Sequence, residues 1–211
     1  MRAPRPSYLE ASLSHAPAMS VALASPRPSA ADALRRADTS LAVQVAGIVG
    51  FALLAAAGAQ VKLYLWEVPI TLQTLAVYGA GLFLGSRNGA LSMVLYLAVG
   101  LLFPVFAGEG HGLGYLMGLS GGYLLAYPLV AALIGALSRR WNTLAGSALA
   151  VAAGSALLFT CGVTWLHFAA GHATWTESIV KGWALFIVWD LAKVGLTASS
   201  YAGLRRLLAR G

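Results

Sequence analysis

The chain has 211 residues, of which 59% are hydrophobic and only 10% are charged. Soluble domains average about 45–50% apolar and about 25% charged residues, so seven acids and fourteen bases cannot supply the polar surface of a soluble globule of this size. The mean hydropathy of +0.75 excludes disorder for most of the chain. A single cysteine, Cys161, excludes an internal disulfide framework and a CxxC metal site. An integral membrane protein built as one compact domain remains.

Residues 1–38 differ from the rest of the chain. They are rich in Pro, Ser, Ala and Arg and lack a sustained helical period, which predicts a disordered cytoplasmic tail. A secretory signal peptide is the alternative, because residues 22–24 have the small-x-small pattern of a cleavage site. The stretch before that site is interrupted by Ser12, Ser14 and Pro17, so it lacks the continuous apolar core of a signal peptide.

Six apolar segments follow the tail. They cover residues 41–61, 70–84, 89–105, 115–137, 144–168 and 179–204. A helix needs about 20 residues to cross a hydrocarbon core of ~30 Å. The second and third segments are short for this, so we expect them to tilt or to be sheltered by neighbouring protein. The sequence predicts an all-α membrane protein in which residues 39–211 form one domain of six transmembrane helices.

The basic residues alternate between the gaps. Every arginine lies in the tail, in the second-to-third or fourth-to-fifth gap, or at the C-terminus, whereas Lys62 and Lys181 lie in the other gaps. The positive-inside rule therefore predicts that both termini lie in the cytoplasm, in a multi-pass protein of the cell (inner) membrane. Because these bases form no stripe on a soluble face, the net charge of +7 does not indicate nucleic acid as a partner.

Asp190 and Lys193 are the only charged residues within the predicted bilayer depth. Each costs about 2.5–3.5 kcal/mol at a helix centre, and such residues usually mark functional sites. They lie three residues apart and so share one face of the last helix. If that helix begins near Gly182, Asp190 lies roughly 12 Å into the membrane. We expect the pair to bind a small polar ligand that has both donors and acceptors; a structural ion pair and a proton relay are the alternatives.

Small residues recur in the first apolar segment at Ala52, Ala55, Ala56 and Ala59. Small-xxx-small spacing allows another helix to approach closely. The pattern fits packing inside this bundle and docking to a partner membrane protein equally well.

Enzyme signatures are weak. Gly118-Leu119-Ser120-Gly121 resembles the nucleophile site of rhomboid intramembrane proteases, but a serine nucleophile needs a base. Those enzymes carry a histidine in the last helix, where this chain has none, so an intramembrane serine protease is the weaker alternative. No HxH or HExxH spacing indicates a metal, and no GxxxxGK[ST] motif indicates an ATP site. We therefore expect neither an enzyme nor a bound cofactor.

Several motifs resemble one family. The segment VPITLQT (residues 68–74) opens the second apolar segment, PVFAG (104–108) and GLGYL (112–116) form the third-to-fourth gap, and GGYL (121–124) follows. Together with the Asp190 and Lys193 pair, these stretches resemble the BioY family, the biotin-binding S components of energy-coupling-factor (ECF) transporters. Leu119-Ser120 stands where the family often has Pro-Thr, so the GxSG stretch is a variant start of a binding helix.

The resemblance implies a six-helix S-component fold that captures biotin from the outer side of the membrane. It implies a membrane scaffold subunit and two ATPase subunits as partners, which fits the missing ATP motif. A proton-coupled carrier that acts alone is the alternative. The residues that the resemblance places in the biotin site are Asp190, Lys193, Gln73, Tyr115, Gly114, Phe106 and Tyr123. It assigns docking of the scaffold to Ala52, Ala55, Ala56 and Ala59.

Overall fold

The computed structural model describes residues 35, 39–64, 67–141 and 143–208. Its elements in chain order are α1 (Leu41–Gln60), β1 (Lys62–Leu63), β2 (Ile70–Thr71), α2 (Gln73–Gly79), the π-helical turn η2 (Ala80–Leu84), α3 (Gly85–Leu102), the 3₁₀ turn η3 (Ala107–Glu109), α4 (Gly112–Leu116), α5 (Gly121–Ser138), α6 (Leu144–Ala170), α7 (Trp175–Gly182), the 3₁₀ turn η4 (Ala184–Phe186) and α8 (Ile187–Leu208). Apart from Arg35, the predicted tail lies outside the described residues. The protein is mostly helical; the prediction of an all-α fold missed only the short antiparallel pair β1–β2.

Four helical segments are long and apolar enough to cross a membrane. They are Leu41–Gln60, Gln73–Glu109, Gly121–Ser138 and Leu144–Ala170. The second of these is folded back, because Gly85 has φ 76° and ψ −174°, a conformation open to glycine, and it redirects the chain between η2 and α3. α8 has 22 residues but carries Asp190 and Lys193, which reduce its hydropathy.

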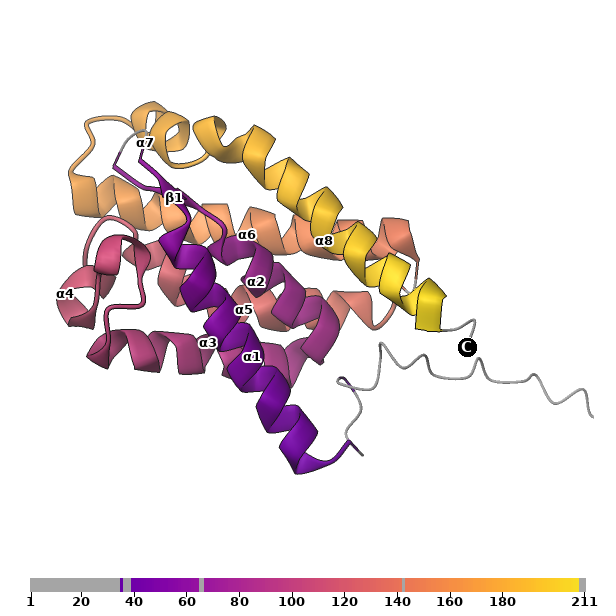
Figure 1. Cartoon of the computed structure of the whole chain (residues 1–211). Coiled ribbons are helices and arrows are strands. Elements are labelled where there is room, and N and C mark those ends of the chain that lie inside the picture. Colours follow the sequence, from indigo (N-terminus) through magenta and orange to yellow (C-terminus); the bar gives the residue numbers. More distant parts are fainter. Residues whose placement is uncertain (1–34, 36–38, 65–66, 142, 209–211) are drawn as a thin grey trace, which may run out of the picture.

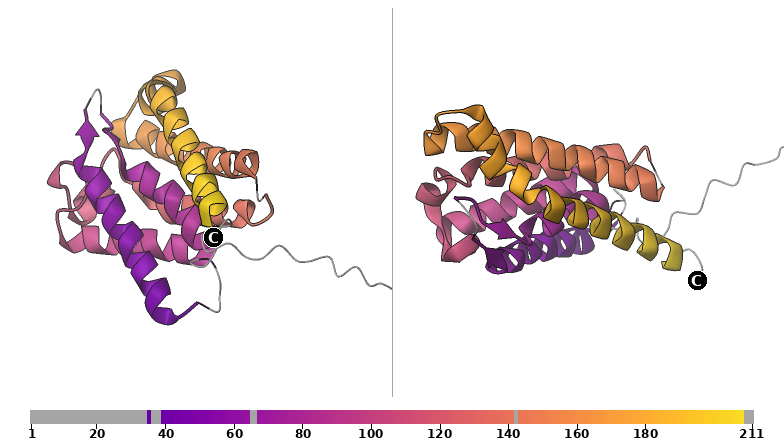
Figure 2. Two further views of the ribbon diagram at one scale, coloured as in Figure 1. Left: turned by 45° about the vertical axis from the view of Figure 1, so that its right-hand side comes forward. Right: turned by 90° about the horizontal axis from the view of Figure 1, so that it is seen from above.

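The helices form a bundle centred on α5. Figures 1 and 2 show α5 between α3 and α6, α1 lying across α2 and α3, and α8 crossing α6. Tyr78, Tyr96, Ile134 and Leu158 fill the interior and are at most 1% exposed. Many large apolar side chains on the outside of the bundle are exposed, for example Leu129 at 61%. An apolar exterior of this kind fits a protein that faces lipid.

Local sequence determines where several helices begin. The side chains of Ser40, Thr143 and Thr174 accept hydrogen bonds from the first turns of α1, α6 and α7, respectively. Each bond satisfies a backbone N–H that has no partner inside its own helix. The polar residue at each of these positions therefore fixes the helix start.

The small-residue face of α1 packs inside the bundle. Ala55 and Ala59 are fully buried, Ala52 is 6% exposed and Ala56 is partly buried. α1 contacts α2 and α3 through this side. The close approach that the spacing predicted is therefore made within the chain by the three buried alanines. Docking of a scaffold subunit on this face of α1 stays a prediction.

The last apolar segment is divided. Trp183 has φ −137° and ψ −55°, so α7 ends before it and α8 begins only at Ile187. Asp190 consequently lies in the first turn of α8, and the predicted depth of 12 Å along a helix from Gly182 is wrong. A carboxylate in a first turn is stabilised by the positive end of the helix dipole, which lowers the cost of placing it there.

The two ends of the bundle differ in charge. At one end Arg35 donates to Tyr201 Oη at 2.6 Å and to Ser138 Oγ at 2.6 Å, which ties α8 to α5. Five more arginines lie at the same end of the bundle, near the termini of α3, α5 and α8: Arg87, Arg139, Arg140, Arg205 and Arg206. The opposite end carries β1–β2, η3, α4 and α7. We call the end with the arginines the arginine end and the opposite end the loop end.

Candidate substrate-binding site

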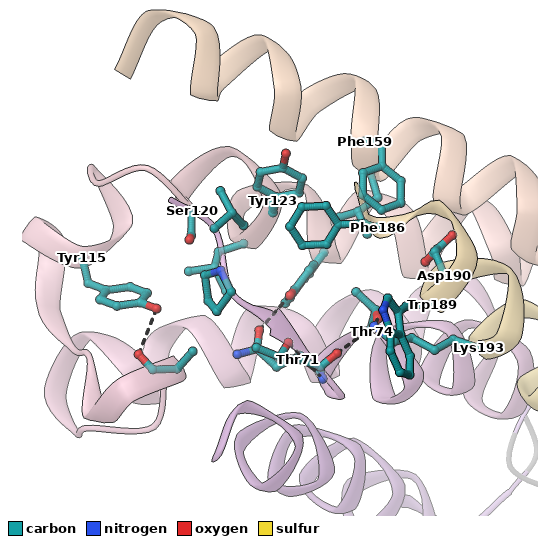
Figure 3. A pocket seen from close by; sticks show the side chains of 17 residues that line it. Thr71, Thr74, Tyr115, Ser120, Tyr123, Phe159, Phe186, Trp189, Asp190 and Lys193 are labelled. Carbon is teal, nitrogen blue, oxygen red and sulfur yellow. Dashed lines mark hydrogen bonds between the residues drawn. The ribbon is translucent and has the colours of Figure 1, made fainter. Parts of the chain in front are cut away.

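A cavity near the loop end collects five of the residues predicted to form the site. Asp190 and Lys193 come from α8, Gln73 from α2, Tyr115 from α4 and Tyr123 from α5 (Figure 3). α6 and η4 complete the wall with Leu158, Phe159 and Phe186. The cavity measures about 60 Å³, well below the ~300–1,000 Å³ typical of small-molecule pockets. Its side chains must therefore move apart to admit a ligand larger than a few waters.

Asp190 is held in place by two hydroxyl groups. Tyr78 Oη donates to Asp190 Oδ1 at 2.6 Å, and Ser155 Oγ donates a short hydrogen bond to Oδ2. Asp190 is 5% exposed, and Tyr78 is completely buried. Because each carboxylate oxygen can accept two hydrogen bonds, each retains capacity for a donor on a ligand.

Lys193 lies one turn further along α8 and turns toward α2. Its Nζ donates to Thr71 O at 2.7 Å and to Thr74 Oγ1 at 3.0 Å. An ammonium has three protons, so one is left for a ligand. Asp190 and Lys193 do not form an ion pair, which among the described residues requires an N–O separation of at most 4.0 Å. Each charge has its own neutral partners, so the pair is not a structural salt bridge.

Gln73 adds an amide group to the cavity wall. It is 3% exposed, and Tyr127 Oη donates to Gln73 Oε1 at 2.7 Å. This bond fixes which end of the amide is the acceptor and leaves the NH₂ group to donate. The site therefore offers an acceptor at Asp190 and donors at Lys193 and Gln73.

Aromatic side chains form the rest of the wall. Tyr123 makes an edge-to-face contact with Phe159 at 6.2 Å, and Phe159 packs on Phe186 at 6.2 Å between ring centroids. Tyr123 Oη donates to Gly182 O at 2.7 Å, which links α5 to the end of α7. The wall suits the apolar body of a ligand whose polar groups reach the three polar residues.

Residues 30–210 match the BioY family. The chain belongs to the BioY family. It is 34% identical over 153 residues to the probable biotin transporter BioY of Pyrococcus horikoshii, covering 72% of this chain and 90% of that protein. It is 32% identical over 158 residues to the biotin transporter BioY of Thermotoga maritima, covering 74% and 92%.

A solved structure has the same fold. The chain aligns with a TM-score of 0.72 and 25% identity to the crystal structure of the S-component for biotin from an ECF-type ABC transporter. The alignment covers 77% of this chain and 90% of that one. BioY proteins are transporter components, and family membership therefore argues against the enzyme alternatives.

Two predicted site residues lie outside the cavity wall of this BioY protein. Phe106 is fully buried and stacks on Tyr115 with ring centroids 5.2 Å apart, so it supports a wall residue from behind. Gly114 is exposed, and a Cβ added there would meet nothing within 4 Å. The motifs that contain both residues shape the η3–α4 loop instead of lining the cavity.

An ion-pair cluster joins the segment between β1 and β2 to α7 and the loop before it. Lys181 Nζ in α7 lies 2.7 Å from Glu67 Oε1 and 2.9 Å from Glu177 Oε1, and His172 Nε2 lies 3.5 Å from Glu67 Oε1. Glu67 directly precedes Val68 and Pro69, which line the cavity. The hydrogen bond from Lys181 is the main cause that lowers the pKa of Glu67, against the opposing effect of burial. The hydrogen bonds that Lys181 makes to Glu177 and Glu67 raise the pKa of Lys181. We call these four residues the loop clasp.

Ser120 lines the cavity but has no histidine beside it. His167 Nδ1 and His172 Nδ1 lie 2.9 and 3.0 Å from Ser178 Oγ, so both rings are engaged at α7. Within the described part of the chain, the protease alternative therefore lacks the histidine base that rhomboid proteases use. No group of three or more His, Cys, Asp or Glu is placed to hold a metal ion among those residues either.

Several residues of the site have no distinct sequence signal. Tyr78 and Ser155, which hold Asp190, lie in long apolar segments beside many similar residues. A buried carboxylate requires donors, but the sequence does not say which hydroxyls supply them. Thr71 and Thr74 belong to the VPITLQT motif, whose resemblance to BioY could have indicated them.

Proposed function

We propose that the protein binds biotin in this cavity and serves as the membrane subunit for its uptake. The observation that carries the proposal is the convergence of Asp190, Lys193 and Gln73 on one cavity whose remaining wall is aromatic, in a chain of the BioY family. Relatives that it covers almost completely are named biotin transporters.

The chemistry of biotin fits this set of groups. Its ureido ring has N–H donors and a carbonyl acceptor, its tail ends in a carboxylate, and its body is apolar. Asp190 accepts an N–H, whereas Lys193 and Gln73 donate to a carbonyl or carboxylate oxygen. Tyr115, Tyr123 and the neighbouring aromatic rings enclose the apolar body.

The proposed membrane arrangement has six crossings, with both termini in the cytoplasm of the cell (inner) membrane. The crossings are α1, α2 with η2, α3, α5, α6 and α8. Support comes from the arginine end, since positive-inside charge bias puts that end in the cytoplasm and the loop end, with its cavity, on the outer side. A reporter fused to the C-terminus that is active only in the cytoplasm tests this arrangement; activity of a periplasmic reporter there contradicts it.

We further propose that transport needs an ECF module with a membrane scaffold subunit and two ATPase subunits. The solved structure with the same fold is described as an S-component of an ECF-type ABC transporter, and the sequence has no P-loop motif. Uptake of labelled biotin in cells that lack the module tests the proposal. Uptake without the module that an uncoupler abolishes favours the solitary proton-coupled carrier instead.

Calorimetry on the purified protein tests biotin binding directly. We expect binding at one site, and Lys193→Met to weaken it about 10- to 150-fold through loss of a charge-assisted hydrogen bond. Lys62→Met is the matched control, because Lys62 is exposed in β1 and lies outside the cavity wall. Absence of binding by the unaltered protein contradicts the function. Equal affinity of the Lys193 variant and the unaltered protein contradicts only the site.

A further inference from the structure

A second cavity lies at the arginine end, opposite the proposed biotin site. It measures about 320 Å³ and is bounded by the start of α1, the turn between η2 and α3, and the end of α5. Arg35, Arg87 and Arg139 line it together with Gln44, Ser86 and Asn88. Among the described residues no carboxylate is part of this wall, and the acids of those residues all lie in loop-end segments or in the first turn of α8. Three positive charges therefore surround one polar cavity.

The charge of Arg35 is fixed in position but not neutralised by the groups it contacts. Its three hydrogen bonds go to neutral acceptors: Tyr201 Oη, Ser138 Oγ and Gly135 O at 3.2 Å. Its Nε is buried and has no hydrogen-bond partner. A buried donor without a partner is costly, so this guanidinium group, which lines the cavity, still has capacity for another acceptor.

Arg87 and Arg139 add two further guanidinium groups to the cavity wall. Both side chains are exposed, and neither makes a hydrogen bond or ion pair within the described ranges. Their guanidinium groups are thus available to bind a ligand through paired N–H donors. Guanidinium forks match the geometry of phosphate oxygens, which accept two parallel hydrogen bonds.

The position of the cavity indicates the source of the phosphate. The surrounding helices are long enough to cross a membrane and expose apolar side chains along their length, so their ends lie at the level of lipid headgroups. Basic pockets between transmembrane helices bind anionic headgroups. We propose that Arg35, Arg87 and Arg139 bind the phosphate of an anionic phospholipid in this cavity.

Native mass spectrometry of the full chain in detergent tests this site. The probes are phosphatidylglycerol, as the anionic lipid, and phosphatidylcholine, whose headgroup has no net charge. We expect the unaltered protein to retain one phosphatidylglycerol in preference to phosphatidylcholine. The double variant R87Q/R139Q should retain it at least about tenfold less. The matched control R140Q/R206Q removes the same charge from exposed positions outside the cavity wall and should bind as the unaltered protein does.

Additional variants and probes distinguish a bound lipid from a soluble anion and from a partner subunit. Each single variant, R87Q or R139Q, should show a smaller loss, which keeps the test available if the double variant is unstable. Equal losses in the control, or unchanged retention in R87Q/R139Q, would overturn the proposal. Inorganic phosphate that stabilises the protein and displaces the lipid would identify a soluble anion as the ligand. Variants that keep the lipid but lose biotin uptake would indicate that these arginines contact a partner subunit. Both the displacement of lipid by phosphate and this loss of uptake alone would contradict a lipid site.

Discussion

Replacing Asp190 with Asn tests the proposed site at its most constrained residue. The carboxylate accepts from Tyr78 at 2.6 Å and from Ser155, and both donors come from neighbouring helices. Asn retains an oxygen for Tyr78 and nearly the same shape. It presents an NH₂ group on the other side, where Asp190 now accepts from Ser155 and where a ligand N–H requires an acceptor. The variant therefore changes hydrogen bonding and charge with little change in volume.

The expected effect on binding is larger than that on folding. Ser155 can rotate its hydroxyl to accept from the Asn amide, but a ureido N–H cannot reverse its role. Loss of one charge-assisted hydrogen bond to the ligand corresponds to about 1.5–3 kcal/mol. Since about 1.4 kcal/mol is a factor of ten, we expect Kd for biotin to rise roughly 10- to 150-fold.

Calorimetry of Asp190→Asn and a thermal unfolding curve without ligand separate these two effects. Glu109→Gln is the control, because it removes one acid from an exposed position in η3 outside the cavity wall. Tyr78→Phe should destabilise the ligand-free protein by about 1–3 kcal/mol, since it removes a buried donor to the carboxylate. If Asp190→Asn binds biotin within twofold of the unaltered protein, the reasoning is refuted, because the ligand then does not contact this carboxylate.

Other changes test the loop clasp, the packing and the serine. Glu67→Gln should speed biotin release a few-fold, because it removes the charge that attracts Lys181. Dissociation time courses measure this rate, and an unchanged rate would show that the loop clasp does not slow release. The pKa of Glu67 is lowered from its ordinary value of 4.5, so the loop clasp should persist above pH 4.5 and weaken as the pH falls through the lowered pKa. Biotin release from the unaltered protein should therefore become faster at low pH, whereas release from Glu67→Gln should not change with pH in this range. Gly162→Ala should destabilise the protein by about 1–3 kcal/mol, as its Cβ would lie 2.1 Å from the Tyr123 ring, whereas Gly50→Ala meets nothing within 4 Å and should lower no melting temperature. Ser120→Ala should still bind biotin, and a serine-reactive probe should label neither form; labelling that this substitution removes would revive the protease.

Elements that depend on local sequence were predictable. The composition indicated a membrane protein, and α1 and α6 begin at the predicted residues and end within two of the predicted limits. Long apolar runs fix helices because a chain in lipid must satisfy its own backbone hydrogen bonds. The starts of α5 and α8 were predicted too early, because the apolar content continues through the ends of α4 and α7 and through the breaks that follow them, at residues 117–120 and 183–186. A hydropathy average does not reveal such breaks, because the residues on both sides of a break are equally apolar.

The residues of the cavity were partly predictable, for a different reason. Asp190 and Lys193 stood out by themselves because charge is costly in a membrane. Gln73, Tyr115 and Tyr123 came only through resemblance to a family. Phe106 and Gly114 came the same way but lie outside the wall, because a motif records which residues a loop needs and not which of them face a ligand.

The sequence alone determined that this is a membrane protein, that its arginines fall in alternate gaps between apolar segments, and that one acid and one base lie within an apolar segment. The tertiary structure decided which partners those charges have. Tyr78, Ser155, Thr71 and Thr74 reach α8 from other helices and loops, and the alanines of α1 turn inward to let α2 and α3 approach. Such contacts depend on which faces meet across the bundle, and this is set by the packing of all the helices together and by no single segment.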